Sequence, residues 1–220
     1  MSIELNQKYP SYNNLDGLFE LHVTVDCSDV GAFSQFCQKM DKPKLKPVVI
    51  ELPYGENQKQ VMTSNWVVGS YEKACGILQQ VTKLVSSQGY SISRSKIEAL
   101  ASTKGVPETS EQVTTFPESN YFEFHAKVVI PDEKMSRIEE LSKLALSKNA
   151  HLSKNGLKQE KPGLNARFVN LRVSLKPKNE AFKLRDELVQ ALNEADWQTE
   201  KVQSEYVVYD SNLKYDQGWM

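Results

Sequence analysis

The sequence lacks several features that mark common classes of protein. No uninterrupted apolar run approaches the ~20 residues that a membrane-spanning helix needs. An excess of charge is also missing: the net charge is -1 and the pI is about 6.3, which removes the usual electrostatic basis for binding nucleic acid or an anionic membrane surface. Gly-rich phosphate loops with Walker or Rossmann spacing are absent as well. We therefore expect neither nucleic acid nor membrane as a partner.

Cysteine is scarce, and its spacing excludes two further classes. Cys27, Cys37 and Cys75 show no Cys-x-x-Cys spacing and cannot all pair within one chain. They are interpreted as reduced thiols, with Cys37 and Cys75 on apolar faces of predicted helices. The first eight residues lack the apolar core of a signal peptide. These features predict a cytoplasmic protein.

The most informative feature present is a duplicated segment. Residues 18–25 read LFELHVTV, and residues 121–128 read YFEFHAKV, with Phe, Glu, His and Val in the same places. Each copy opens about ninety residues in which the apolar periodicity predicts the same order of strands and helices. The first copy predicts strands at 18–25, 48–52, 62–69 and 90–99, with helices near 28–40 and at 71–88. The second predicts strands at 121–130, 150–153, 168–175 and 197–209, with helices from about 132 and at 179–194.

The shared order β-α-β-β-α-β is that of the ferredoxin-like unit. The predicted fold class is therefore α+β, a tandem duplication of ferredoxin-like βαββαβ units with antiparallel sheets. We expect a first unit over 1–100, a connector over 101–119, a second unit over 120–210 and a C-terminal strap over 211–220. The strap ends in Tyr, Trp and Met, which is unusual for a disordered terminus.

Polar side chains of the duplicated strands are predicted to share the sheet face that the helices leave open. The apolar half of each strand must lie under the helices, because exposing it would cost roughly 1.5–3 kcal/mol per large side chain. The open faces then carry Glu20, His22 and Thr24 in one copy and Glu123, His125 and Lys127 in the other. Neighbouring strands add further polar residues: Asn65, Arg94, Lys96, Glu98, Asn170, Arg172, Lys201, Gln203 and Glu205.

Packed against each other, the two open faces would line a polar cleft, which is a typical ligand site. This predicts binding of a small anionic ligand, including a phosphate-bearing one. The candidate ligand-binding residues are Glu20, Thr24, Arg94, Lys96, Glu123, Lys127, Arg172 and Lys201.

Two alternatives stay open beside the ligand cleft. Charged residues interleaved on an open sheet face often form ordinary cross-strand ion pairs, or hold one half of a protein against the other. The chain would then be a non-catalytic interaction module that docks a partner, or a second copy of itself, through that face. Whether the chain is an enzyme also stays open at this point.

The string His22-Val23-Thr24-Val25 resembles the His-x-Thr-x motif of the 2H phosphoesterases, which are duplicated α+β proteins with one histidine per lobe. That resemblance implies a phosphodiesterase-like hydrolase in which His22 and His125 act as general acid and base. The second copy departs from the motif, since Lys127 stands where Thr or Ser is expected. A lysine can still bind phosphate as a point charge, so the hypothesis keeps His22 and His125 as paired catalytic candidates.

Two further observations bear on cofactors and family. Glu20, His22, Glu123 and His125 would suit zinc or iron by ligand type, but only if the two faces converge closely. We therefore expect no metal ion, and no cofactor is identified. Strings spread over nearly the whole chain resemble a family of uncharacterised microbial proteins, a resemblance that implies no activity: Met62-Thr63-Ser64, Arg94 to Glu98, Gly105-Val106-Pro107, Tyr121 to His125, and the Tyr209-Asp210-Ser211-Asn212 and Gly218-Trp219 strings near the end.

Overall fold

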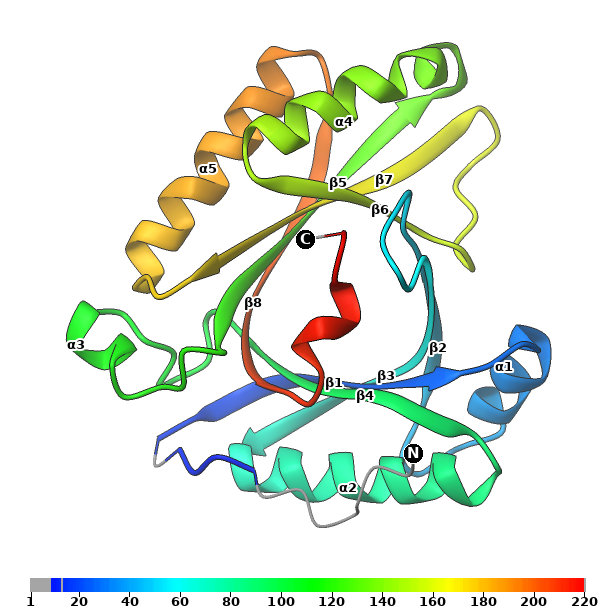
Figure 1. Ribbon diagram of the computed structural model, residues 1–220, viewed down its shortest axis with the longest axis vertical. Coiled ribbons are helices and arrows are strands. Elements are labelled where there is room, and N and C mark those ends of the chain that lie inside the picture. Colours follow the sequence, from blue (N-terminus) through cyan, green and yellow to red (C-terminus); the bar gives the residue numbers. More distant parts are fainter. Residues whose placement is uncertain (1–8, 13, 220) are drawn as a thin grey trace. The chain divides into compact units, whose positions relative to one another are not determined.

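The computed structural model describes residues 9–12 and 14–219, in which the predicted succession of strands and helices occurs twice (Figure 1). The chain forms two compact units, and neither is continuous in sequence. Unit 1 contains the chain up to Val49, Lys59–Val106 and Tyr206–Tyr215. Unit 2 contains Ile50–Gln58, Pro107–Glu205 and the chain from Asp216.

Unit 1 has the ferredoxin-like order of elements, and its sheet runs β4-β1-β3-β2. The central strand pairs antiparallel with both of its neighbours. The bounds are β1 (Asp16–Asp26), α1 (Val30–Gln38), β2 (Lys46–Glu51), β3 (Lys59–Ser70), α2 (Tyr71–Ser87) and β4 (Ser91–Leu100).

The core of unit 1 lies between its sheet and α2, which runs along one face of the sheet (Figure 1). Phe19, Leu21 and Val23 alternate along β1 and are fully buried. The matching side of α2 carries Ala74, Leu78, Val81 and Val85 at helical spacing, and all four are fully buried. The two apolar periods, two residues in the strand and 3.6 in the helix, therefore meet in one layer.

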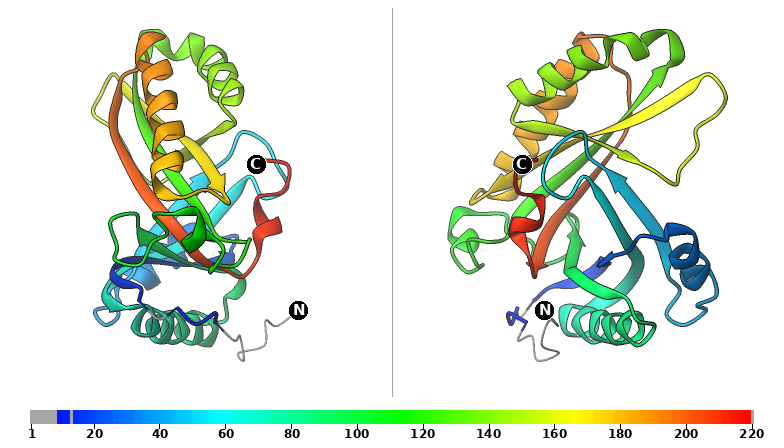
Figure 2. Two further views of the ribbon diagram at one scale, coloured as in Figure 1. Left: turned by 90° about the vertical axis from the view of Figure 1, so that its left-hand side faces the viewer. Right: turned by 45° about the vertical axis from the view of Figure 1, so that its right-hand side comes forward.

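Unit 2 repeats this plan with the sheet order β6-β7-β5-β8. Two independent views show α4 beside α5 (Figure 2), and these helices contact each other. The remaining elements, in chain order, are α3 (Ser110–Val113), β5 (Tyr121–Pro131), the 3-10 helix η1 (Asp132–Arg137), α4 (Ile138–Ser147), β6 (Ala150–Asn155), β7 (Leu164–Ser174), α5 (Lys178–Glu194), β8 (Thr199–Asp210) and the 3-10 helix η2 (Leu213–Asp216). The part of β8 from Tyr206 and the part of η2 up to Tyr215 belong to unit 1.

The predicted fold class is confirmed. The duplicated strings lie in β1 and β5, and these strands hold equivalent places, each between the third and the fourth strand of its unit. Cys37 and Cys75 are buried and, like Cys27, are free thiols. Among the described residues, none of the helices is both long and apolar enough to cross a membrane.

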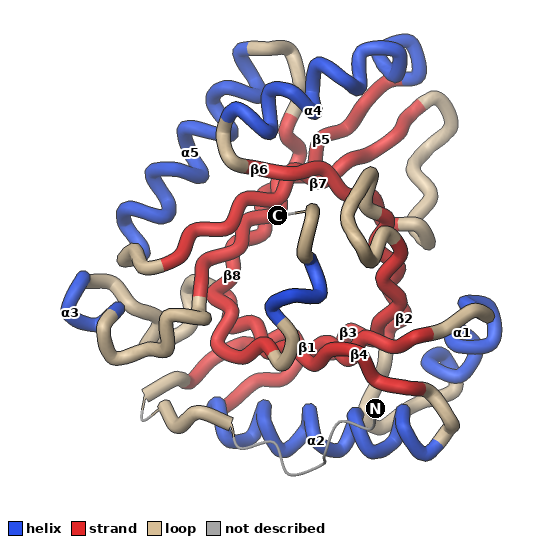
Figure 3. Tube along the Cα trace, in the orientation of Figure 1, coloured by secondary structure: helices blue, strands red, loops and turns tan. Residues whose placement is uncertain are grey.

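Local details differ from the sequence-based expectations at helix ends and in the connector, where Figure 3 shows the short helix α3. Serine is a favoured helix cap, so the sequence predicts that Ser28 caps the first helix. The cap of α1 is instead Asp29, whose carboxylate accepts a hydrogen bond from the Ala32 amide at 2.9 Å. The connector contains α3, which begins with a capping box between Thr109 and Gln112. The expected helix after Asp132 starts with a 3-10 turn, η1, before it continues as α4.

The C-terminal residues make specific contacts in each unit. In unit 1, the Ser211 amide donates to the Ser95 carbonyl at 3.0 Å, and the Asn212 side chain donates to the Ser93 carbonyl at 3.1 Å. In unit 2, the Trp219 indole donates to the Leu152 carbonyl at 3.0 Å. The end of the chain is thus held by directed hydrogen bonds as well as by burial of Trp219, which is 5% exposed.

Candidate functional site

The open face of unit 1 gathers polar side chains around His22 of β1. Antiparallel pairing puts His22 opposite Ser64 of β3 and Lys96 of β4, because β1 lies between those strands. Glu20, two residues earlier on the same side, lies opposite Glu98 of β4. Alternation along β1, read from the sequence, therefore placed Glu20 and His22 on a common face correctly.

Both ring nitrogens of His22 have oxygen partners. Its Nε2 lies 2.8 Å from Glu98 Oε2 and 3.8 Å from Glu20 Oε1. Its Nδ1 lies 3.1 Å from the Thr63 carbonyl oxygen, which can only accept a hydrogen bond. Nδ1 must therefore carry a hydrogen, and Nε2 is the nitrogen that faces the carboxylates.

The carboxylates control the charge of His22. Burial lowers the pKa of His22, but the charge and hydrogen bond of Glu98, helped by Glu20, outweigh burial and the opposing charge of Lys96. The net effect raises the pKa to about 9. At neutral pH His22 is an imidazolium, which has no lone pair with which to accept a proton.

The predicted cations of unit 1 are matched by carboxylates of the same unit. The Arg94 guanidinium donates to both oxygens of Asp210, at 2.9 and 2.5 Å, and lies 6.0 Å from the centre of the Tyr215 ring. Lys96 forms an ion pair with Glu98. Thr24 is on the same side of β1 but is only 2% exposed.

Unit 2 contains a similar arrangement around His125 of β5. Its Nε2 lies 3.4 Å from Glu205 Oε2 of β8, and its Nδ1 lies 2.6 Å from Asn170 Oδ1 of β7. The Asn170 amide nitrogen donates to the His151 carbonyl, the Ser153 hydroxyl and the Phe168 carbonyl, at 2.9–3.2 Å. This fixes Oδ1 as the atom facing His125, so Nδ1 of His125 carries a hydrogen.

The remaining candidate ligand-binding residues of unit 2 do not form one cluster, because they contact different partners. Arg172 donates to Glu123 Oε1 at 2.9 Å and to Asp216 Oδ2 at 2.5 Å. Lys127 donates to Glu200 at 2.6 Å and to Glu160 at 3.2 Å. Lys201 is exposed on β8.

The sequence-based prediction selected the two histidines as candidates but not the carboxylates that they contact. Glu98 and Glu205 were placed on the open faces, yet neither was selected as a site residue. The usable signal was the sheet order, because the ferredoxin-like unit places its fourth strand beside its first. A glutamate at the matching position of that strand is therefore within reach of the histidine in both copies. That His22 and His125 act as a pair stays a prediction.

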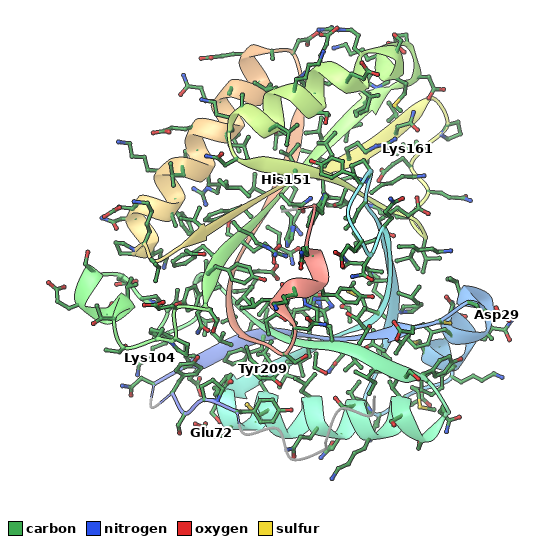
Figure 4. All side chains as sticks on the ribbon, viewed as in Figure 1. Asp29, Glu72, Lys104, His151, Lys161 and Tyr209 are labelled. Atoms are coloured by element: carbon green, nitrogen blue, oxygen red, sulfur yellow. The ribbon has the colours of Figure 1, made fainter. Side chains whose placement is uncertain are left out.

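Unit 2 also contains a cavity of about 350 Å³ at the β6–β7 hairpin. The labelled side chain of Lys161 marks this hairpin in Figure 4. Four of the lining residues are cationic and only Glu160 is acidic. The full lining is Lys154, Asn155 and residues 158–168.

Arg167 is the most informative residue of this cavity. Burial lowers the pKa of Arg167, while Glu51 raises it to a smaller extent. Its guanidinium donates to the Ala166 carbonyl at 2.8 Å, and it forms no ion pair with any carboxylate in the described part of the chain. The hairpin residues were not among the predicted site residues, although the sequence shows two lysines, Lys158 and Lys161, between Gly156 and Gly163.

Comparisons with known proteins assign no family to the chain. It matches no family model and no curated protein. A solved structure titled as that of a candidate glycine cleavage system transcriptional repressor aligns with a TM-score of 0.31 and 10% sequence identity, over 88% of this chain and 98% of that one. At this level of likeness we draw nothing from it about function.

Proposed function

We propose that the chain binds a small anionic ligand, such as a phosphate-bearing or carboxylate-bearing metabolite, in the cavity of the β6–β7 hairpin. The observation that carries the proposal is Arg167, a partly buried guanidinium in the cavity wall that has no carboxylate partner among the described residues. A guanidinium presents a planar fork of donors that fits phosphate or carboxylate oxygens in pairs. A bound anion would offset the hydration that the Arg167 guanidinium loses on burial.

The rest of the cavity supports the same ligand class. Lys154, Lys158 and Lys161 add three positive charges around Arg167. Two of these lysines form ion pairs, Lys154 with Glu51 at 3.6 Å and Lys158 with Glu160 at 3.4 Å. Both lysine side chains are about half exposed, so these ion pairs are weak. Such lysines can turn toward a ligand at little cost. The volume is at the lower end of the ~300–1,000 Å³ range of small-molecule pockets, which favours a compact anion.

This proposal keeps the predicted ligand class but changes the residues. The open-face cations Arg94, Arg172 and Lys127 already contact carboxylates of their own units. Lys127 is nevertheless connected to the cavity, because its partner Glu160 is part of the lining. The hydrolase alternative receives less support, since a protonated His22 cannot act as general base at neutral pH.

The proposal is tested by calorimetric titration with inorganic phosphate, pyrophosphate and citrate, together with thermal shifts at constant ionic strength. At 100 times its Kd, an anion should stabilise the wild-type chain by roughly 2.7 kcal/mol. Arg167→Gln should weaken binding by about 10- to 100-fold, because hydrogen bonds to a charged group are lost.

The matched control is Arg137→Gln. Arg137 is an exposed arginine that pairs with Glu140 at 2.8 Å on the surface, so this variant makes the same charge change away from the cavity. It should bind as the wild type does. Equal affinity in the two variants, or a stabilisation that follows ionic strength alone, would contradict the proposal.

A second candidate function is self-association through the open face of unit 1. Trp66 and Val68 lie two apart on β3, on the side of Glu20 and Leu18, and are 46% and 68% exposed. Adjacent exposed apolar side chains of this size mark interaction surfaces. Sedimentation equilibrium should then show dimers of the wild type and monomers of Trp66→Lys, whereas a monomeric wild type at all concentrations would exclude this candidate.

A further inference from the structure

We infer that Glu20, His22 and Glu98 of unit 1 form a binding site for a divalent transition-metal ion, with Zn²⁺ the best match to this ligand set. One ligand atom from each residue lies within 4.8 Å of the other two. Imidazole nitrogen and carboxylate oxygen are both ordinary zinc ligands, at about 2.0–2.2 Å from the metal. Small side-chain movements would bring all three atoms to that distance from a common centre.

The histidine is oriented as a metal-binding histidine usually is. Nδ1 of His22 donates to the Thr63 carbonyl of β3 at 3.1 Å, which directs Nε2 at the two carboxylates. In metalloproteins the second ring nitrogen almost always donates to a carbonyl or carboxylate in this way, which fixes the tautomer and the ring plane. The nitrogen that a metal would bind is therefore the one that faces Glu20 and Glu98, and the metal must displace the proton that this nitrogen carries at neutral pH.

The two carboxylates also have outer partners from neighbouring strands. The Ser64 hydroxyl of β3 donates to Glu20 at 2.5 Å, and Lys96 of β4 pairs with Glu98. Hydrogen bonds to ligating carboxylates are the usual second layer of a metal site. All three ligands of unit 1 are thus supported by residues of the same sheet.

The two units differ at the residue opposite the glutamate of the duplicated string. In unit 2, Glu123 corresponds to Glu20, and the residue opposite it on β7 is Arg172, which donates to Glu123 at 2.9 Å. In unit 1, the residue opposite Glu20 on β3 is Trp66, which has no charge. The cross-strand neighbour of this glutamate is thus a cation in unit 2 and an uncharged side chain in unit 1.

This site differs from the metal site weighed in the sequence, because its third ligand comes from the fourth strand of the same unit. It is also independent of the anion-binding cavity in unit 2. Three protein ligands leave a fourth coordination position for water or an exchangeable ligand, the pattern of open rather than structural zinc sites.

The test uses the full chain, stripped of metal with EDTA and titrated with Zn²⁺ by calorimetry and with Co²⁺ by visible spectroscopy. The wild type should bind one Zn²⁺ per chain. His22→Ala and Glu98→Gln should each weaken Zn²⁺ binding by more than the ~10- to 100-fold typical of a second-layer change, and Ser64→Ala should fall within that range. Glu98→Gln keeps the shape of the side chain, so it tests the site even where His22→Ala perturbs folding.

The matched control is Glu200→Gln, which alters another lysine-paired strand carboxylate. Its Zn²⁺ affinity should equal that of the wild type. The inference is overturned if the wild type binds no Zn²⁺, or if His22→Ala and Glu98→Gln bind as the control does. It is also overturned if Co²⁺ gives a thiolate-to-cobalt charge-transfer band, which would place the metal on a cysteine.

Discussion

At the residue scale, His22 is held by charge rather than by packing alone. Burial lowers the pKa of His22, but the charge and hydrogen bond of Glu98 outweigh burial and raise the pKa to about 9. The value expected in the unfolded chain is 6.5. The folded state therefore binds the proton more tightly than the unfolded state does. Stability from this contact is fully present below pH 6.5 and is lost as the pH rises through 9.

This linkage predicts a pH-dependent stability that Glu98→Gln removes. In metal-free buffer, the wild type should lose on the order of 2–3 kcal/mol of unfolding free energy between pH 6 and pH 9 through this pair. Urea denaturation at several pH values measures the loss. Glu98→Gln should flatten the profile, while Glu72→Gln, on the exposed side of α2, should leave it unchanged. A profile that is equally steep in Glu98→Gln would refute the assigned role.

Residue-scale contacts were predictable only where local alternation decides them. The common side of Glu20 and His22 follows from the two-residue period of β1. The pairing of Arg94 with Asp210 could not be predicted in this way, because the two residues are 116 positions apart in the sequence. Local periodicity contains no information about which distant segment contacts a given side chain. Such a contact decides whether an arginine or lysine pairs with a carboxylate of the protein or can bind a ligand.

At the element scale, α2 shows how far the 3.6-residue period of a helix predicts which residues are buried. Helical spacing alone predicts one apolar face made of Ala74, Ile77, Leu78, Val81, Leu84 and Val85. Four of these residues are fully buried, whereas Ile77 and Leu84 are only half-buried. Short elements were less predictable, since α3 depends on a capping box in a connector rather than on an apolar stripe. The cap of α1 falls on Asp29 instead of Ser28, because either side chain could supply the accepting oxygen.

The packing of α2 gives a prediction with a neighbouring control. Leu78→Ala removes a fully buried side chain between α2 and the sheet and should lower the unfolding free energy by about 2–5 kcal/mol. Gln79→Ala, one position along and exposed, should change it by no more than ~0.5 kcal/mol. Chemical denaturation compares them, and similar losses in both variants would contradict the assignment of the buried face.

At the scale of the whole molecule, duplication predicted the fold class because two copies of one pattern restrict the topology more than either copy does. The duplication does not predict which segments of the chain join each compact unit. Unit 1 includes Tyr206–Tyr215 and unit 2 includes Ile50–Gln58, so each unit uses a segment from outside its own copy. The cavity for which we propose anion binding was missed for a related reason. It lies in a hairpin of the second copy, Lys154 to Phe168, whereas the sequence-based prediction followed the residues that both copies share.

The most direct test of the proposed function is an NMR titration of the ¹⁵N-labelled chain with pyrophosphate, which reports on every backbone amide at once. We expect saturable shifts concentrated at residues 154–168, with Arg167 among the largest, and their loss in Arg167→Gln. Saturable shifts centred elsewhere, with residues 154–168 unperturbed, would contradict the proposed function.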